Sequence, residues 1–460
     1  MTINPCIRWT LTALISVVAT VVQASEGHPD TRDDWFKASE IVQAVQPPQI
    51  PNRDYVITDF GARSGTRHDA HAAIHAAIDK ASEEGGGRVV IPKGTWLSKG
   101  PIHLKSRINL HVSEGATVLF SPDPEDYLPA VLTRWEGIEM YGYSPLIYAR
   151  DVEDVAVSGK GTFDGNAKSE FHKWKEKEAD DLAEIRRMGG AGVPVEERQF
   201  NKGRYLRPTM IQIMGGKRVL LEDYTATNSP FWINHLVYVD QALVRNVKVD
   251  SHFANNDGLD IESSTYVVAE HNNFKTGDDA IVVKSGRDYD GRRIGRPSEN
   301  IVIRNNVFGG EDGIGMGSEM SGGIRNVFIE NNTYTEGTSA FRFKANLDRG
   351  GSVEHIRLRN MHIKSTELLF WFELTYVAGA QGGNFPSLYS DIVFEDITVE
   401  TVGKVFHANA PKGYPLTDVT LRNIRIEEAD ELFTIENVDN LVFDNVQVGD
   451  QRINGRLDWK

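Results

Sequence analysis

Three aspartates that lie close together in the sequence could carry out acid–base chemistry. Asp257 stands in the segment Asn255-Asn-Asp-Gly258, and Asp278 and Asp279 stand in Thr276-Gly-Asp-Asp279. Neighbouring carboxylates raise the pKa of at least one member, so that one carboxyl group keeps its proton while another is ionised. Glycoside hydrolysis needs this division, because an acid protonates the leaving oxygen while a second carboxylate acts on the anomeric carbon or on water.

The same aspartates have two other interpretations. Aspartates beside glycines can bind calcium through their carboxylate oxygens. Asp and Asn also occur at the corners of repeated coils, where the side chain only stabilises a turn. The spacing of the residues leaves these alternatives open beside catalysis.

The elements that must position the aspartates are short β-strands. From Arg88 onward, runs of β-branched residues end at Gly, Asn, Asp or Pro. One phrase recurs: two apolar residues with one residue between them, then a charged residue and Asn or Asp. It begins at Val219, Ile301, Val327, Ile356, Ile392, Val419 and Leu441. The starts from Ile301 onward lie 26, 29, 36, 27 and 22 residues apart.

Units of this length predict an all-β solenoid. Each unit is too small to bury an apolar face alone, so successive units must stack. Asn after each strand fits a turn with left-handed backbone. Asp257 and Asp278 are 21 residues apart, which is close to one repeat, so we expect them in adjacent coils about 4.8 Å apart. A large antiparallel β-sandwich is the alternative.

Two segments have helical character. Asp69–Ser82 repeats Ala and Ile at helical spacing, Asp69 can cap its N-terminus, and the glycines from Gly85 end it. We therefore predict a short helix that caps the solenoid. The charged segment Lys168–Arg187 interrupts the strand pattern. We interpret it as a long excursion beside the cleft, which either contacts substrate or is only a solvated helix.

The first residues have the features of a secretory signal peptide. Arg8 precedes an apolar run that ends at Val22. The predicted divisions of the chain are a signal peptide at 1–24, a lead-in at 25–54 and a catalytic solenoid at 55–460. The single cysteine, Cys6, would leave with the signal, so we expect a secreted or periplasmic protein without disulfides.

The net charge of the chain is −15, which argues against nucleic acid or an anionic membrane surface as the partner. No segment after the signal has about 18 apolar residues in a row, so no membrane embedding is expected. An acidic polymer would also be repelled by this charge. If the substrate is polyanionic, the cleft must therefore carry a local cluster of Arg and Lys.

Ordered blocks of sequence carry a family resemblance. They are Asp59-Phe-Gly-Ala62, Gly161-Thr-Phe-Asp-Gly165, Asn228-Ser-Pro-Phe-Trp232, the two aspartate segments, Gly317-Ser-Glu-Met-Ser-Gly-Gly323, Arg342-Phe-Lys344 and Arg349-Gly-Gly351. In this order the sequence resembles glycoside hydrolase family 28, the polygalacturonase-like hydrolases, and in particular their bacterial exo-acting branch. The resemblance covers most of the chain. It implies a right-handed parallel β-helix that hydrolyses pectic galacturonan or a related polymer with inversion.

The resemblance also implies roles for individual residues. Asp278 matches the general acid, and Asp257 and Asp279 match the pair that activates water. Arg342 and Lys344 match the basic residues that hold the substrate's carboxylate beside the scissile bond. No cofactor and no metal ion is implied.

Further positions belong to the expected substrate site. Tyr376 matches an aromatic residue of the same subsite, and His235 either lines the cleft or is a packed, hydrogen-bonded side chain. The family usually has Gly-His-Gly before the Gly-Ser pair, but here a carboxylate, Glu311 or Asp312, replaces the histidine. We expect this carboxylate to raise the pKa of Asp278 and to select against a galacturonate carboxylate nearby, unless it is only exposed on a loop.

The sequence thus predicts a secreted inverting glycoside hydrolase that acts as a monomer on an acidic polysaccharide, releases sugars from chain ends and has an altered subsite beside the bond. Two rivals remain. A polysaccharide lyase on the same fold would need calcium and a basic proton acceptor. A non-catalytic carbohydrate-binding solenoid, such as a surface adhesin, is kept open by the altered histidine position.

Overall fold

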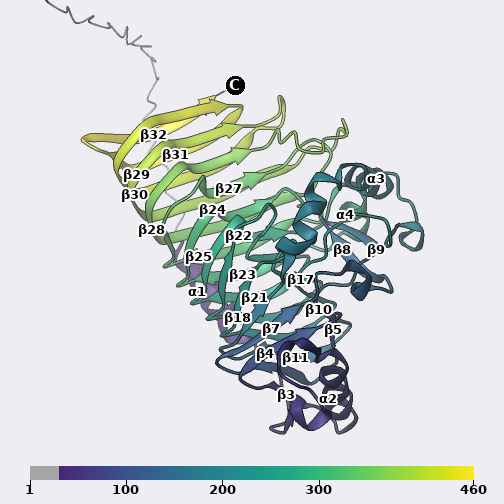
Figure 1. Ribbon diagram of the computed structural model, residues 1–460. Coiled ribbons are helices and arrows are strands. Elements are labelled where there is room, and N and C mark those ends of the chain that lie inside the picture. The colour runs from purple at the N-terminus through teal and green to yellow at the C-terminus, as the bar shows by residue number, and fades with distance from the viewer. Residues whose placement is uncertain (1–30, 460) are drawn as a thin grey trace, which may run out of the picture.

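A computed structural model describes residues 31–459, and the chain there folds into a right-handed parallel β-helix (Figure 1). Each full coil contributes one strand to each of three parallel sheets. We call them the first, second and third sheets, in the order in which the chain visits them within a coil. The predicted signal peptide at 1–24 lies outside the described residues.

The strands of the three sheets are as follows. The first sheet contains β1 (Asp54–Val56), β3 (Gly87–Ile91), β6 (Ile108–Val112), β11 (Glu153–Ser158), β15 (Lys217–Glu222), β18 (Asp240–Arg245), β21 (Thr265–Glu270), β23 (Ser298–Arg304), β25 (Ile324–Glu330) and β31 (Val438–Val448). The second contains β2 (Gly65–Asp69), β4 (Gly94–Ser98), β7 (Ala116–Phe120), β12 (Thr162–Asp164), β16 (Thr225–Thr227), β19 (Lys248–Ser251) and β26 (Thr333–Tyr334). The third contains β5 (Ile102–Leu104), β10 (Ile147–Arg150), β14 (Ile211–Met214), β17 (Asn234–Val237), β20 (Leu259–Glu262) and β27 (Ser339–Lys344).

Longer strands bend from one sheet into the next. β22 (Asn273–Lys284) and β24 (Val307–Gly317) pass from the second sheet to the third. β28 (Ser352–Glu373), β29 (Leu388–Asn409) and β30 (Leu416–Glu436) run through all three sheets. The final strand, β32 (Gln451–Trp459), pairs antiparallel with β31 and covers the C-terminal coil.

The recurring phrase of the sequence is the stacking unit of the first sheet. The starts from Ile301 to Leu441 pair in register from each coil to the next. The Asn or Asp that ends the phrase has a positive φ in every instance: 71° at Asp223, 55° at Asn305, 57° at Asn331, 52° at Asn360, 55° at Asp396, 51° at Asn423 and 58° at Asn445. Both predictions are confirmed, because Asn and Asp tolerate the left-handed backbone that this corner requires.

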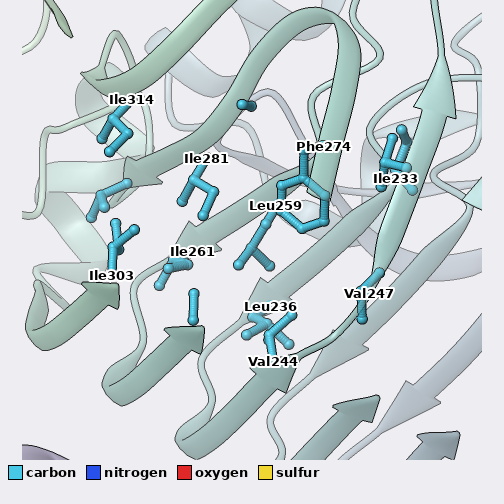
Figure 2. Packing of buried hydrophobic residues seen from close by; sticks show 14 of the residues in the cluster. Ile233, Leu236, Val244, Val247, Leu259, Ile261, Phe274, Ile281, Ile303 and Ile314 are labelled. Atoms are coloured by element: carbon cyan, nitrogen blue, oxygen red, sulfur yellow. The ribbon is translucent and has the colours of Figure 1, made fainter. Parts of the chain in front are cut away.

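Alternating apolar residues fill the interior of the coils (Figure 2). Leu259, Ile281 and Ile314 stack on one another in successive coils and are almost completely buried. Each such side chain contributes about 1.5–3 kcal/mol of burial energy. A shift of one residue would turn this column to the surface, so the column fixes the register and leaves intervening residues such as Asp260 on the outer face.

The predicted capping helix is present as α2 (His71–Glu83). Ile74 and Ile78 on its inner face are fully buried at the N-terminal end of the solenoid. The N-cap residue is Ala70 and not the predicted Asp69, but the Asp69 carboxylate, one residue earlier, accepts a hydrogen bond from the backbone N–H of His71 (2.9 Å), the first helical residue. Gly85 and Gly86 follow with φ of 88° and 113°, which end the helix.

A second helix, α1 (Arg32–Ala44), lies within the lead-in, for which we predicted no helix. It runs along the outer face of the first sheet (Figure 1), and Trp35, Ala38 and Ile41 pack on side chains of three successive coils, Val268, Val302 and Phe328. The Trp35 indole also donates to Glu395 (2.8 Å). Thus α1 links coils that are far apart in sequence.

The excursion predicted from its charge forms a separate layer beside the third sheet. It contains α3 (Ala179–Gly190) and the 3₁₀ helices η3 (Ala167–Ser169), η4 (Phe171–Glu176) and η5 (Val195–Glu197). Figure 1 shows α3 beside α4 (Asp288–Ile294) and near β8 (Val131–Trp135) and β9 (Ile138–Gly142). These two strands form a small sheet with β13 (Gln199–Phe200). Ile185 of α3 is fully buried in this layer, so α3 is not merely a solvated helix.

Two further 3₁₀ helices, η1 (Ile57–Phe60) and η2 (Pro124–Tyr127), join strands near the N-terminal end. Across residues 31–459, none of the helices is both long enough and apolar enough to cross a membrane.

Candidate active site

The three aspartates lie together where the second sheet turns into the third. Asp257 precedes β20, and Asp278 and Asp279 lie in the middle of β22. The backbone N–H of Gly258 donates to the Asp279 carbonyl (2.9 Å), so the two segments are in adjacent coils as the 21-residue spacing predicted. One carboxylate oxygen from each aspartate lies within 4.8 Å of the other two.

The three carboxyl groups have different surroundings, which favour different protonation states. Burial, together with the adjacent charge of Asp279, raises the pKa of Asp278 to about 6. Burial and then the charge of Asp260 raise the pKa of Asp257 well above its usual range. Asp279 instead lies 2.6 Å from the Lys344 ammonium, which stabilises negative charge on it. The cluster therefore offers a protonated carboxyl beside an ionised one, as acid–base catalysis requires.

Two lysines supply positive charge among the aspartates. Lys344, at the end of β27, is buried. Lys284, at the end of β22, lies 3.7 Å from Asp257, 3.8 Å from Asp260 and 3.2 Å from Glu319. Both ammonium groups lie against carboxylates of the cluster and would repel a divalent cation, so the charges favour proton transfer over calcium binding.

Arg342 lies one coil beyond Asp312 in the third sheet. Its guanidinium donates to Asp312 (2.7 Å) and to Glu373 (2.8 Å), and stacks 3.9 Å from the centre of the Trp371 ring. Tyr376 lies near the same guanidinium, with its ring centre 5.9 Å away. Tyr376 thus lies near Arg342, as expected for residues of one subsite, but two carboxylates already neutralise the arginine.

Glu311 and Asp312 have different surroundings. Asp312 is buried, stands in register with Asp279, and accepts hydrogen bonds from Ser339 (2.6 Å) and Arg342 (2.7 Å). Glu311 is exposed, and its pKa is raised by partial burial of its carboxyl group and by the charge of Asp278. The negative charge of Asp312 contributes to the raised pKa of Asp278, as the sequence led us to expect of a carboxylate here.

His235 is fully buried within the described chain. Its Nε2 lies 2.9 Å from Glu262, its Nδ1 lies 3.0 Å from the Gln212 amide nitrogen, and its ring packs edge-on against Trp232. Burial lowers its pKa. These contacts agree with a packed, hydrogen-bonded histidine, the alternative to a residue that lines the cleft.

Several residues at this site were not singled out by sequence reasoning. Asp260 is fully buried and lies 3.8 Å from Lys284, but neither of its carboxylate oxygens has a hydrogen-bond partner among residues 31–459, and burial raises its pKa. Glu319 bridges Lys284 to Arg287 (3.0 Å). Asp260 could have been found, because it follows Asp257 by three residues in the same segment. Glu319 depends on a contact between coils that spacing does not reveal.

Comparison with known proteins agrees with this geometry. The profile of Glycosyl hydrolases family 28 matches residues 87–446, and that of Rhamnogalacturonase A/epimerase, pectate lyase-like, matches residues 56–112. A probable polygalacturonase of Vitis vinifera is 27% identical over 452 residues, covering 93% of this chain and 84% of that protein. An endo-polygalacturonase of Pectobacterium carotovorum subsp. carotovorum is 26% identical, covering 88% of this chain and 94% of that protein.

Among solved structures, a hyperthermoactive exopolygalacturonase from Thermotoga maritima superposes with a TM-score of 0.88 and 38% identity, covering 93% of this chain and 100% of that one. A polygalacturonase from Erwinia carotovora subsp. carotovora, 24% identical with a TM-score of 0.67, covers 86% of this chain and 98% of that one and shares the fold. The profile match over residues 87–446, the similarity to the Thermotoga enzyme and the carboxylate cluster show that the chain is a glycoside hydrolase and belongs to glycosyl hydrolases family 28.

Proposed function

We propose that this enzyme is an exported exo-acting hydrolase of pectic galacturonan or a related uronate-bearing polysaccharide. The observation that carries the proposal is the contrast between Asp278, whose pKa is raised to about 6, and Asp279, which is paired with Lys344 at 2.6 Å. Several relatives are named for the same substrate class, including the Vitis polygalacturonase and the Thermotoga exopolygalacturonase.

In the proposed reaction, the Asp278 carboxyl group donates its proton to the glycosidic oxygen as the bond to the anomeric carbon breaks. A water held by Asp257 and Asp279 attacks that carbon, and its proton passes to the Asp279 carboxylate. The products are a shortened chain and a free sugar. The proton taken from water then returns to Asp278 through solvent, which restores the starting state.

The excursion supports action at a chain end. A Cβ placed on Gly190 of α3 would lie 2.9 Å from Gln381, and one on Gly379 would lie 2.1 Å from Arg186 of α3. The loop that follows β28 therefore touches α3, although the two are far apart in the sequence. We propose that this contact closes one side of the substrate site, where a long polymer would otherwise continue.

The proposal of inversion follows the family resemblance. Inverting enzymes usually hold their two carboxyl groups about 6.5–9.5 Å apart, whereas oxygens of Asp257, Asp278 and Asp279 come within 4.8 Å of one another. Distance alone would therefore favour retention. Because two aspartates can hold one water between them here, we propose a single displacement, and the anomer of the first product decides the point.

The subsite beside the bond is proposed to differ from that of a plain polygalacturonase. The Asp312 carboxylate already accepts hydrogen bonds from Ser339 and Arg342. Of the two carboxylates, Glu311 is therefore the one that can face substrate near Asp278. A negative group there repels a galacturonate carboxylate. We therefore propose that a neutral or substituted sugar is preferred on that side, and that plain polygalacturonate is a weak substrate.

The test uses purified protein on a panel of pectic and algal polysaccharides, with products identified by mass spectrometry. A saturated monosaccharide released from chain ends supports the proposal, and Asp278→Asn should release none. An unsaturated uronide would identify a lyase instead, and binding without any product would identify a carbohydrate-binding solenoid. Export is proposed from the signal at 1–24, and N-terminal sequencing of the mature protein should begin at Ser25.

A further inference from the structure

A groove follows the corner between the second and third sheets, on the C-terminal side of the aspartates. Its volume is about 570 Å³, which lies within the range of about 300–1,000 Å³ that is typical of ligand pockets. Segments of four successive coils line it: Glu336-Gly-Thr338, Ser365-Thr-Glu367, Thr401-Val-Gly403, and Glu428 with Asp430. Steps of about 4.8 Å between these coils make the groove roughly 14 Å long, which suits an extended chain.

The groove continues directly from the aspartate site. Glu311 lies one coil beyond Asp278, and its carbonyl accepts a hydrogen bond from the backbone N–H of Thr338 (2.6 Å). The carbonyl of Gly337 accepts a hydrogen bond from the backbone N–H of Glu367 (3.2 Å) in the next coil. Each of these bonds joins one coil to the following one, so the groove begins two coils beyond Asp278.

The excursion lies on the opposite, N-terminal side of the aspartates. The ammonium of Lys175 in η4 donates to the side-chain oxygen of Asn255 (3.2 Å). The Asn255 amide nitrogen in turn lies 3.5 Å from the Asp278 carboxylate. Because the excursion reaches the aspartates from that side, the groove on the other side offers a path to the rest of a polymer.

Backbone forms part of the floor of the groove. A Cβ on Gly337 would lie 2.6 Å from the carbonyl oxygen of Glu311, and a Cβ on Gly403 would lie 2.7 Å from the carbonyl oxygen of Glu367. Only glycine fits at either position. No side chain therefore fills the groove there, and the space above these two residues is left to a ligand.

The lining of the groove carries negative charge without a cation. It contains four carboxylates, and no Lys, Arg or His of the described chain lines it. All four are exposed, and within residues 31–459 none of them has a side-chain hydrogen bond or an ion pair: Glu336, Glu367, Glu428 and Asp430. Lys404, the residue after Gly403, is already paired with Glu431 (2.9 Å).

These charges determine which chain the groove can accept. Two like charges about 4 Å apart in water repel each other enough to change an equilibrium constant about fivefold, so a run of free galacturonates is disfavoured here. Carboxylates accept hydrogen bonds from hydroxyl groups, and an uncharged sugar unit presents several hydroxyl groups. The groove therefore favours units that carry hydroxyl groups and no carboxylate.

We infer that this groove binds an uncharged stretch of the substrate, so that the enzyme removes sugars from the end of a chain whose following units carry no charge. Neutral sugars and methyl-esterified uronates both meet this requirement. The inference rests on the proposed function and extends it from the single sugar beside Glu311 to the rest of the polymer. Glu367 and Asp430 are specificity-determining residues, because they accept hydroxyl donors and repel carboxylates.

The experiment compares the double variant Glu367→Gln/Asp430→Asn with the control Glu354→Gln/Glu427→Gln. The control removes two charges from the same strands, β28 and β30, at positions that do not line the groove. Each protein is assayed on three pentasaccharides that share a free galacturonate at the end to be released. The other four units are free galacturonates in the first, methyl-esterified galacturonates in the second and neutral hexoses in the third.

Wild-type KM should be at least about 10-fold lower for one or both of the uncharged-tail substrates than for the free acid. The double variant should lower KM for the free acid about 10-fold and leave kcat unchanged, because the groove is remote from the breaking bond. The control should keep the wild-type values. A low KM for the esterified substrate alone identifies esterified pectin, and a low KM for the hexose substrate alone identifies a neutral block; either supports the inference.

Two kinetic outcomes would overturn the inference and leave the hydrolase proposal intact. One is a wild-type KM that is lowest for the free acid. The other is a KM for the free acid that is the same in the double variant and in the control.

Binding without turnover keeps the two proposals separate. Each pentasaccharide is titrated by calorimetry into Asp278→Asn, alone and combined with either double variant. The free acid should bind more tightly as salt is added, because salt screens like charges at the surface, and the groove variant should weaken this dependence more than the control does. Tighter binding of an uncharged-tail substrate supports the groove even if the wild type releases no sugar. Equal binding of all three substrates refutes it, and thermal melting verifies that every variant is folded.

Discussion

Replacing Asp278 by asparagine should make the enzyme inactive and more stable at the same time. The folded protein raises the pKa of this carboxyl group from 3.8 to about 6. A carboxyl group whose pKa is higher in the folded than in the unfolded state binds its proton more tightly when the protein is folded. The folded state therefore loses stability as the pH rises from about 4 to about 6, and at higher pH the loss stays constant. Asparagine cannot ionise and therefore removes the penalty.

The magnitude follows from the size of the shift. About two pKa units correspond to about 3 kcal/mol, which is an upper value because the side chain is partly exposed. For a chain of 460 residues the unfolding entropy makes 1 kcal/mol worth about 1 °C in Tm. Thermal melting should therefore show Asp278→Asn about 2–3 °C above wild type at pH 7 and equal to it at pH 3.5, where Asp278 is protonated.

Turnover should respond in the opposite direction. Asparagine has no proton to give, so kcat should fall at least about 100-fold. In the wild type, the protonated fraction of Asp278 is about 90% at pH 5 and about 10% at pH 7 for a pKa of about 6, so kcat should decline over that range. Asp151→Asn, at a side chain that is 74% exposed, serves as the control for a charge change at the surface.

Two results would refute this reasoning. If Asp278→Asn gains as much stability at pH 3.5 as at pH 7, the gain does not come from ionisation. If the variant retains near-normal turnover, Asp278 is not the proton donor, whatever its pKa.

Other substitutions test the remaining contacts. Lys344→Met should lower kcat about 100-fold or more, because Asp279 loses the ammonium at 2.6 Å; unchanged kcat would make the lysine structural. Glu311→His should raise the rate of cleavage of plain polygalacturonate, whereas Asp312→His should lower Tm through the loss of two buried hydrogen bonds. If Asp312→His raised the cleavage rate and Glu311→His lowered Tm, Asp312 would be the residue that faces substrate and Glu311 the structural one. Trp35→Ala should cost about 3–5 kcal/mol in a denaturant titration, and an unchanged midpoint would show that α1 does not stabilise the solenoid.

The solenoid could be predicted because its rule is local. Apolar residues at every second position and an Asn or Asp at the left-handed corner recur in each coil, so the phrase that begins at Ile301 already contains the turn geometry found at Asn305. The helix α1 could have been recognised by its apolar residues at three-residue spacing, Trp35, Ala38 and Ile41. The prolines that follow it and the polar residues around it concealed the pattern.

The site was only partly predictable for a different physical reason. Residues that lie in one segment, such as Asp278 and Asp279, keep their relationship in any fold. The partners of Arg342 come from neighbouring coils, Asp312 from the coil before it and Glu373 from the one after. Which residues meet there depends on loop lengths between coils, and these lengths vary. The sequence therefore indicated that Arg342 and Lys344 are important but not that carboxylates neutralise them.

The protonation states at the site depend on where the lysines lie, and we propose that this is how the enzyme works without the family's histidine. Lys344 stabilises the negative charge of Asp279. Asp278 has no ion pair among residues 31–459, and burial and the neighbouring charges, that of Asp312 among them, raise its pKa to about 6. The negative charge of Asp312 thus helps to keep the Asp278 carboxyl group protonated. Because the acid is maintained without a histidine, we propose that the exchange at 311 and 312 leaves proton transfer available and changes instead which sugar can lie beside Glu311.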